Sequence, residues 1–140
     1  MKILLAACNA KYIHSNLAVF NLKAYAKEYD SQVVLREYTI NQLKDDILKD
    51  IYRCHPDVVC VSCYIWNITF VRELMQDLRK ILPDVPFWAG GPEVSYDAET
   101  FLGKNPAFNG VMVGEGEETF LELVKHYVNG SVTLEETRGL

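Results

Sequence analysis

The chain has 140 residues, of which 49% are hydrophobic and 24% are charged, and these proportions predict a single soluble domain with a buried core. The formal net charge of −5 would repel a phosphate backbone, which argues against a nucleic acid as the main partner. The apolar runs fall short of the roughly 20 residues of a membrane span, and Met1 leads into a strand pattern without a cleavage site. We therefore expect a cytoplasmic protein with no membrane partner.

Five short strand patterns alternate with helical ones along the chain. In order, the strand patterns cover Lys2–Cys8, Gln32–Tyr38, Asp57–Ser62, Pro86–Ala89 and Gly110–Val113. Three of them are nearly continuous in apolar residues, which is typical of strands buried on both faces. Between the strands, apolar residues recur at a spacing of three to four and predict amphipathic helices. The resulting stripes are Leu17, Phe20 and Ala24; Leu43, Ile47 and Ile51; Val71, Leu74, Met75, Leu78 and Ile81; and Phe120, Leu123, Val124 and Tyr127.

The boundaries of these elements agree with an alternating order. Residues that cap or end helices stand beside the stripes: Ser15 or Asn16 before the first, Asn41 before the second, and Pro83 and Pro86 after the third. A shorter helix is predicted over residues 97–102. Strands and helices joined by short links predict an α/β domain over residues 1–130, with a parallel sheet of about five strands. Residues 131–140 lose helical periodicity, so we expect them to begin a linker to a further domain.

The four cysteines are expected to be free thiols, because the chain carries no secretion signal. Cys60 and Cys63 have a spacing that also occurs in zinc and redox sites. An offset of three along a strand points the two side chains to opposite faces, which favours small core or site-lining residues over a metal or redox pair.

In parallel sheets of this kind, ligands bind outside the carboxyl ends of the strands. The loops at that edge read "NAKYIHSN", "SCYIWN", "GGPEVSYD" and "GEGEETF", after the first, third, fourth and fifth strands. All four combine small residues with amides, hydroxyls or aromatic rings. The links at the opposite edge, such as "YDSQ" and "CHPD", are plain turns. The composition therefore predicts a binding site at the carboxyl edge.

Several ligand classes do not fit these loops. A P-loop needs G-x-x-x-x-G-K-[ST] after a strand, and the first loop has no glycine. Gly114-Glu-Gly116 imitates part of a dinucleotide fingerprint, but it puts carboxylates where a pyrophosphate would lie. A response-regulator receiver needs acidic residues where this chain has Asn9 and Ser62, and a flavodoxin needs more hydroxyls than the first loop supplies. A large ligand that is neutral or carries amides remains, and the glycines permit its close approach.

At this point the chain resembles a known family, the cobalamin-binding domain at the N-terminus of cobalamin-dependent radical S-adenosylmethionine enzymes. The resemblance rests on "NAKYIHSNLA", "GGPEVSYDAETFL" and "VGEGEETFLEL", and it covers nearly the whole chain. It implies a flavodoxin-like, Rossmann-like three-layer sandwich with strand order 2-1-3-4-5. It also implies that cobalamin is bound with its nucleotide tail against the sheet edge.

The same resemblance implies a longer parent enzyme that transfers a methyl group or runs a related radical reaction. S-adenosylmethionine and an iron-sulfur cluster would belong to its C-terminal radical domain, because this chain lacks the C-x-x-x-C-x-x-C motif. We therefore expect no catalytic residue in the chain itself, whose partners would be cobalamin and that domain.

The expected cofactor contacts lie on the four loops of the carboxyl edge. Amides on the corrin rim can hydrogen-bond to side-chain amides and hydroxyls, and Tyr12, Tyr64 and Trp66 offer flat apolar surfaces. The expected cofactor-binding residues are Asn9, Tyr12, His14, Ser15, Asn16, Ser62, Cys63, Tyr64, Asn67, Gly90, Gly91, Pro92, Glu93, Gly114, Glu115, Gly116 and Glu117. Among them, Gly90 and Gly91 would flank the tail, and Glu93 would face the absent domain.

His14 departs from another cobalamin-binding pattern. Cobalamin domains of the methionine synthase and mutase type carry D-x-H-x-x-G after the first strand, where the His coordinates cobalt and the Asp orients it. Alignment on His14 puts Tyr12 at the Asp position and Leu17 at the Gly position. His14 lacks its orienting partner, so we expect cobalamin to bind without a protein metal ligand.

Structural explanations compete with several of these assignments. Glu115, Glu117 and Glu118 can form an acidic first turn of the last helix, which its dipole favours. Core packing can explain Trp66, Phe87 and Trp88, and a solvated helix face can explain Asp97 and Glu99. A stand-alone ligand-binding or partner-binding regulatory domain is the main alternative function, and a small flavin-type redox protein is another.

Overall fold

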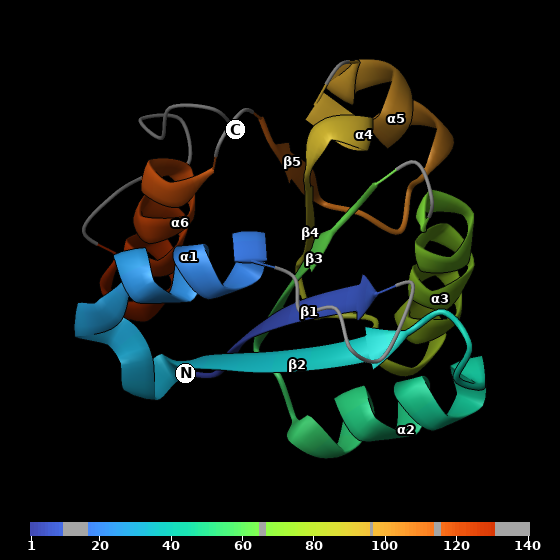
Figure 1. Cartoon of the computed structure of the whole chain (residues 1–140), viewed down its shortest axis with the longest axis horizontal. Coiled ribbons are helices and arrows are strands. Elements are labelled where there is room, and N and C mark those ends of the chain that lie inside the picture. Colours follow the sequence, from blue (N-terminus) through green and yellow to red (C-terminus); the bar gives the residue numbers. More distant parts are fainter. Residues whose placement is uncertain (10–16, 65–66, 96, 114–115, 131–140) are drawn as a thin grey trace.

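The fold is a parallel β-sheet between two layers of helices. The computed structural model describes residues 1–9, 17–64, 67–95, 97–113 and 116–130. Within them, five parallel strands pair in the order β2-β1-β3-β4-β5, which confirms the predicted flavodoxin-like topology (Figure 1). The strands are β1 (Ile3–Asn9), β2 (Val33–Thr39), β3 (Val58–Ser62), β4 (Phe87–Gly90) and β5 (Gly110–Met112).

The helices divide between the two faces of the sheet, as Figure 1 shows. One face is covered by α1 (Leu17–Tyr25) and α6 (Glu117–Asn129). The other is covered by α2 (Lys44–Cys54), α3 (Ile68–Ile81), α4 (Pro92–Ser95) and α5 (Ala98–Lys104). A 3₁₀ helix, η1 (Lys27–Gln32), lies between α1 and β2.

Alternation along the central strands supplies apolar side chains to both layers. In β1, Leu4 and Ala6 belong to the core under α2 and α3, whereas Ile3 and Leu5 belong to the core under α1 and α6. Every residue of β1 and of β3 is buried. A strand that is covered by helices on both faces exposes neither face to solvent, which accounts for the continuous apolar runs of β1 and β3.

A missing side chain allows β4 and β5 to pack under α6. A Cβ at Gly110 would lie 2.2 Å from Cζ3 of Trp88, so the indole ring fills the space that a side chain would take. Trp88 is buried, and its Nε1 donates a hydrogen bond of 3.0 Å to the hydroxyl of Tyr127 on α6. Trp88 is therefore a core residue, in line with the structural explanation given for it, and so is the fully buried Phe87.

Arg79 fastens the amino-terminal ends of β4 and β5 to α3. Its guanidinium donates hydrogen bonds of 2.7 Å to the backbone oxygens of Val85 and Ala107, and one of 2.9 Å to Oδ1 of Asn109. The guanidinium carbon also lies 3.8 Å from the centre of the Phe87 ring. The edge opposite the predicted site is thus held together by structural contacts.

The first two helices depart from the expected pattern. Asn41 does not cap α2, because the residue before the helix is Leu43, which makes no side-chain capping bond. In α1, Phe20 is 42% exposed, and Val19 takes the buried position beside it. The stripe drawn through Phe20 was wrong by one residue, since several neighbouring positions of this helix are apolar and periodicity alone did not fix its phase.

Short helices replace two segments that were expected to be turns or loops. The link that contains "YDSQ" forms η1, and the segment after Gly91 forms α4. The predicted helix over 97–102 is α5, and Asp97 caps it by accepting a hydrogen bond from the Thr100 amide. Within the described residues, no helix combines the length and apolar character needed to span a bilayer. The predicted linker, residues 131–140, lies outside the described residues.

Candidate functional site

The ends of four adjacent strands present polar or absent side chains on one face of the sheet. In register, Asn9 of β1 lies beside Thr39 of β2, and Ser62 of β3 lies beside Gly90 of β4. Side chains an even number of residues apart on a strand point to the same face. Each of these four residues lies an even number of positions after a strand residue that belongs to the core under α1 and α6, so all four face those helices. These core residues are Ile3, Val33, Cys60 and Trp88. We call Asn9, Thr39, Ser62 and Gly90 the polar edge.

The β1 and β2 ends of the polar edge are buried and differ in their bonding. Asn9 is 7% exposed, and its Nδ2 donates a hydrogen bond of 3.1 Å to Oε1 of Glu37 on β2. Thr39 is 6% exposed, and within the described residues its Oγ1 has no hydrogen-bond partner. Sequence reasoning named Asn9 but missed Thr39 and Glu37. Polar residues at the end of the second strand could have indicated them, but the predicted site was built only from the loops after the first, third, fourth and fifth strands.

Asn67, an expected cofactor contact, holds the ends of β1 and β3 together. It is 1% exposed, and its Nδ2 donates hydrogen bonds to the backbone oxygens of Cys8 at 3.0 Å and Ser62 at 3.4 Å. Its Oδ1 accepts a hydrogen bond of 2.7 Å from the backbone amide of Tyr64. Both the nitrogen and the oxygen of the side-chain amide therefore bind protein atoms, and Asn67 holds the backbone of the site in position.

Gly90, the last residue of β4, and Gly91, which follows it, are glycines for different structural reasons. Gly91 has φ +110°, and a Cβ there would lie 2.3 Å from the backbone oxygen of Cys63. The amide of Cys63 in turn donates a hydrogen bond of 2.7 Å to the oxygen of Gly90. Gly91 is thus required by the close approach of the two backbones just after β3 and β4, without any ligand. A Cβ at Gly90 would lie 3.3 Å from Cε of Met112, a flexible side chain, so this position is less constrained.

Gly116 is the N-cap residue directly before α6, on the same side of the sheet. Its φ of +91° is a conformation that favours glycine, and a Cβ there would lie 3.7 Å from Cδ2 of Leu22 on α1. Glu117 and Glu118 form the acidic first turn of α6, where the helix dipole stabilises negative charge. For these two carboxylates the structural explanation is confirmed, while their distance from any cofactor stays untested.

The buried cysteines are core residues. Cys60 lies in the core under α1 and α6, and Cys63 lies in the opposite core with Cys8, as the strand offset predicted. Burial raises the pKa of both Cys8 and Cys60 from 9.0 to about 12, so neither is a thiolate at neutral pH. Within the described residues, no three His, Cys, Asp or Glu side chains come together as a metal site.

Three of the remaining expected contacts lie within the described residues. Tyr64 follows β3 and is half-buried, and Pro92 and Glu93 lie within α4. The expected residues that lie outside the described residues are Tyr12, His14, Ser15, Asn16, Trp66, Gly114 and Glu115. The described part of the site therefore consists of the polar edge, Asn67 with its hydrogen bonds to the ends of β1 and β3, and the start of α6.

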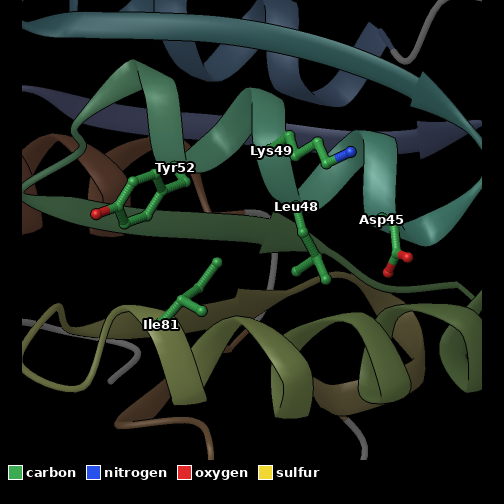
Figure 2. Close-up of a pocket in the computed structure, with 5 residues that line it drawn as sticks. All are labelled: Asp45, Leu48, Lys49, Tyr52 and Ile81. Carbon is green, nitrogen blue, oxygen red and sulfur yellow. The ribbon is translucent and has the colours of Figure 1, made fainter.

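A groove elsewhere on the surface is not part of this site. Its volume is about 420 Å³, and it lies between α2 and the end of α3, as Figure 2 shows. Its lining consists of helix residues only: Asp45, Leu48, Lys49, Tyr52 and Ile81. Since no strand end contributes to it, the groove lacks the position at which parallel sheets bind their ligands.

Comparison with known proteins identifies the family. A family model described as "B12 binding domain" matches residues 3–124 of the chain. The cobalamin-dependent radical SAM methyltransferase TokK of Streptomyces tokunonensis is 31% identical over 111 residues, which cover 74% of this chain and 15% of TokK.

Solved structures agree on the fold. The cobalamin-dependent S-adenosylmethionine radical enzyme OxsB, with aqua-cobalamin and S-adenosylmethionine bound, superposes with a TM-score of 0.79 at 18% identity. The match covers 99% of this chain and 20% of that one. A cobalamin-binding protein from Desulfitobacterium hafniense gives a TM-score of 0.60 at 15% identity, covering 91% of this chain and 59% of that one. Since the family model runs from the first residue of β1 into α6, the chain belongs to the B12-binding domain family and is similar to the cobalamin-binding domains of radical SAM methyltransferases.

Proposed function

We propose that the domain holds cobalamin at the polar edge, with the corrin ring outside the strand ends. The nucleotide tail would run along the face that α1 and α6 cover, past Ser62 and Gly90. One observation carries this proposal: four adjacent strand ends offer an amide, two hydroxyls and bare backbone on the same face. The comparisons support cobalamin as the ligand.

The chemistry of the edge suits this cofactor. A corrin rim with primary amides needs neutral groups that donate and accept hydrogen bonds, and the strand ends carry such groups rather than cations for a phosphate. Asn67 fixes β1 and β3 before any ligand arrives, so little ordering remains to be done on binding. Bound cobalamin supplies a cobalt centre that can carry a methyl group, and the residues of this chain bind and orient it.

The parent protein is the next step of the proposal. The chain spans 15% of TokK and 20% of OxsB, so these relatives hold further domains. We place a radical domain C-terminal to this one in the parent, with S-adenosylmethionine and an iron-sulfur cluster there, and methyl transfer as the reaction. The four free cysteines suit the reducing cytoplasm. Neither the family match nor these relatives favour a stand-alone regulatory domain or a flavin protein.

The direct test is retention of a corrin. The chain is mixed with hydroxocobalamin, passed through a gel-filtration column, and the protein peak is scanned for corrin absorbance, with FMN as a comparison ligand. We expect stoichiometric corrin and no flavin. A protein peak without corrin would refute the proposal for this domain.

A matched pair of variants tests the position of the tail. Gly90→Ala adds a methyl group on the proposed path, against the movable end of Met112, whereas Gly103→Ala adds one where no atom lies within 4 Å. We expect weaker corrin binding in Gly90→Ala only, with both variants folded by circular dichroism. Equal affinity in the two variants would contradict the tail path.

His14 tests the absence of a protein metal ligand. Replacement of His14 by Ala is expected to leave the visible spectrum of the bound corrin unchanged, because we propose that no protein imidazole coordinates cobalt. A shift of the corrin bands in His14→Ala would show that it does.

A further inference from the structure

We propose that Thr39, at the carboxyl end of β2, is a subsite for one of the peripheral amides of the corrin ring. The inference rests on the proposed function and extends the cofactor contacts to the outermost strand of the sheet. It begins from the hydroxyl of Thr39, which finds no hydrogen-bond partner in the described part of the chain.

A buried hydroxyl without a partner is costly, because it has lost its bonds to water and gained none. The backbone of Thr39 is fully used: its amide donates to Oε1 of Gln42 at 2.7 Å, and its oxygen accepts from the Gln42 amide at 3.1 Å. Only the side-chain hydroxyl is left over. Valine has the same shape without this cost and would suit the core that begins at Val33, so a hydroxyl here points to a ligand that bonds to it.

The position of Thr39 places the hydroxyl within the reach of a corrin bound at the polar edge. Thr39 and Asn9 are register partners on the face that α1 and α6 cover. Neighbouring strands are about 4.8 Å apart, and Thr39 lies two residues beyond the level of Ser62 on β3, so the two residues are roughly 12 Å apart. A macrocycle with amide arms around its rim can rest on Ser62 with one part and reach Thr39 with another.

The charges around Thr39 select an amide over an anion. Glu37 lies two residues earlier on the same face of β2, and its carboxylate accepts a hydrogen bond from Asn9. A phosphate would be repelled there, whereas the NH₂ group of a primary amide is attracted. Arg36 does not offset this carboxylate, because it pairs with Asp50 of α2 on the opposite face. A primary amide can donate to the Thr39 hydroxyl or accept from it.

The test uses two substitutions and two corrins. Thr39→Val removes the hydroxyl at constant shape, and Thr39→Ser keeps it. Hydroxocobalamin carries the ring amides and the nucleotide tail, whereas cobinamide carries the ring amides without the tail. Dissociation constants come from visible absorbance titrations, and thermal unfolding of the corrin-free protein is measured for each variant.

The expected result is a change of opposite sign in affinity and stability. Thr39→Val should bind both corrins about fivefold more weakly or worse, which corresponds to about 1 kcal/mol, while its corrin-free form melts about 3 °C higher. Thr39→Ser should bind within about twofold of the wild type, because it keeps the hydroxyl and removes only a methyl group.

Three outcomes would overturn the inference. The first is wild-type affinity of Thr39→Val for both corrins, and the second is a loss confined to hydroxocobalamin, which would assign the contact to the tail. The third is a lower melting temperature of corrin-free Thr39→Val, which would show a structural partner for the hydroxyl. Failure of the wild-type chain to bind any corrin would instead refute the proposed function.

Discussion

Asn67 gives the sharpest test of how the site is built. The sequence predicted that it contacts the cofactor, and in the structure its side chain forms hydrogen bonds with protein atoms. Asn67→Ala removes three side-chain hydrogen bonds: to the Cys8 oxygen at 3.0 Å, to the Ser62 oxygen at 3.4 Å and from the Tyr64 amide at 2.7 Å. The two shorter bonds contribute about 1 kcal/mol each, and leaving their partners unmatched adds roughly 1 kcal/mol more. We expect a loss of about 3 kcal/mol, or about 1.5 M in the urea midpoint at a slope near 2 kcal/mol/M.

The matched control is Asn105→Ala. Asn105 is also buried, and it makes two side-chain hydrogen bonds, from Arg72 at 2.7 Å and to the Phe101 oxygen at 2.8 Å, but it lies at the end of α5. Both variants should lose stability in urea unfolding without ligand. Only Asn67→Ala should also bind hydroxocobalamin more weakly, because only its loss loosens the ends of β1 and β3. An Asn67→Ala protein as stable as the wild type, yet impaired in corrin binding, would refute the positioning role and restore direct contact.

Two further predictions concern the backbone and the buried thiols. Gly91→Ala should lose several kcal/mol, since its Cβ would meet the Cys63 oxygen at 2.3 Å at φ +110°, whereas Gly103→Ala should be neutral or stabilising by about 0.5 kcal/mol; equal urea midpoints would contradict this. Burial raises the pKa of Cys8 and Cys60 from 9.0 to about 12, so the unfolded chain ionises first as pH rises. Stability should be intact below pH 9 and fall between pH 9 and 12, by up to about 1.4 kcal/mol per pH unit for each thiol. Urea unfolding at several pH values measures the slope, and an unchanged slope in Cys60→Ala would disprove the assignment.

The sequence predicted the sheet well because its central strands leave little choice. β1 and β3 are apolar on both faces, and only a parallel sheet between two helical layers buries such runs. The offset between Cys60 and Cys63 placed the two thiols in opposite cores for the same reason. Local pattern and global fold agree at these positions.

The parts that could not be predicted depend on contacts between distant segments. No local pattern tells that Gly91 packs on the backbone of Cys63, or that Gly110 makes room for the Trp88 ring, since both depend on strand register. Asn67 was expected to contact the cofactor because it follows a strand, and its hydrogen bond to Cys8, 59 residues away, could not be read from the sequence. The phase of α1 failed for a local reason, because Val19 and Phe20 were equally apolar candidates for the core.

The buried Trp88 can serve as an intrinsic fluorescence probe of the domain. Its ring lies in the core under α1 and α6, two positions before Gly90, and it is hydrogen-bonded to Tyr127. The chain has two tryptophans, so Trp66→Phe leaves Trp88 as the single indole emitter. Corrins absorb where indole emits, and energy transfer from this ring would then report occupancy of the neighbouring strand end. Unfolding would expose the same ring and shift its emission to the red, so one fluorophore separates loading of the cofactor from loss of the fold.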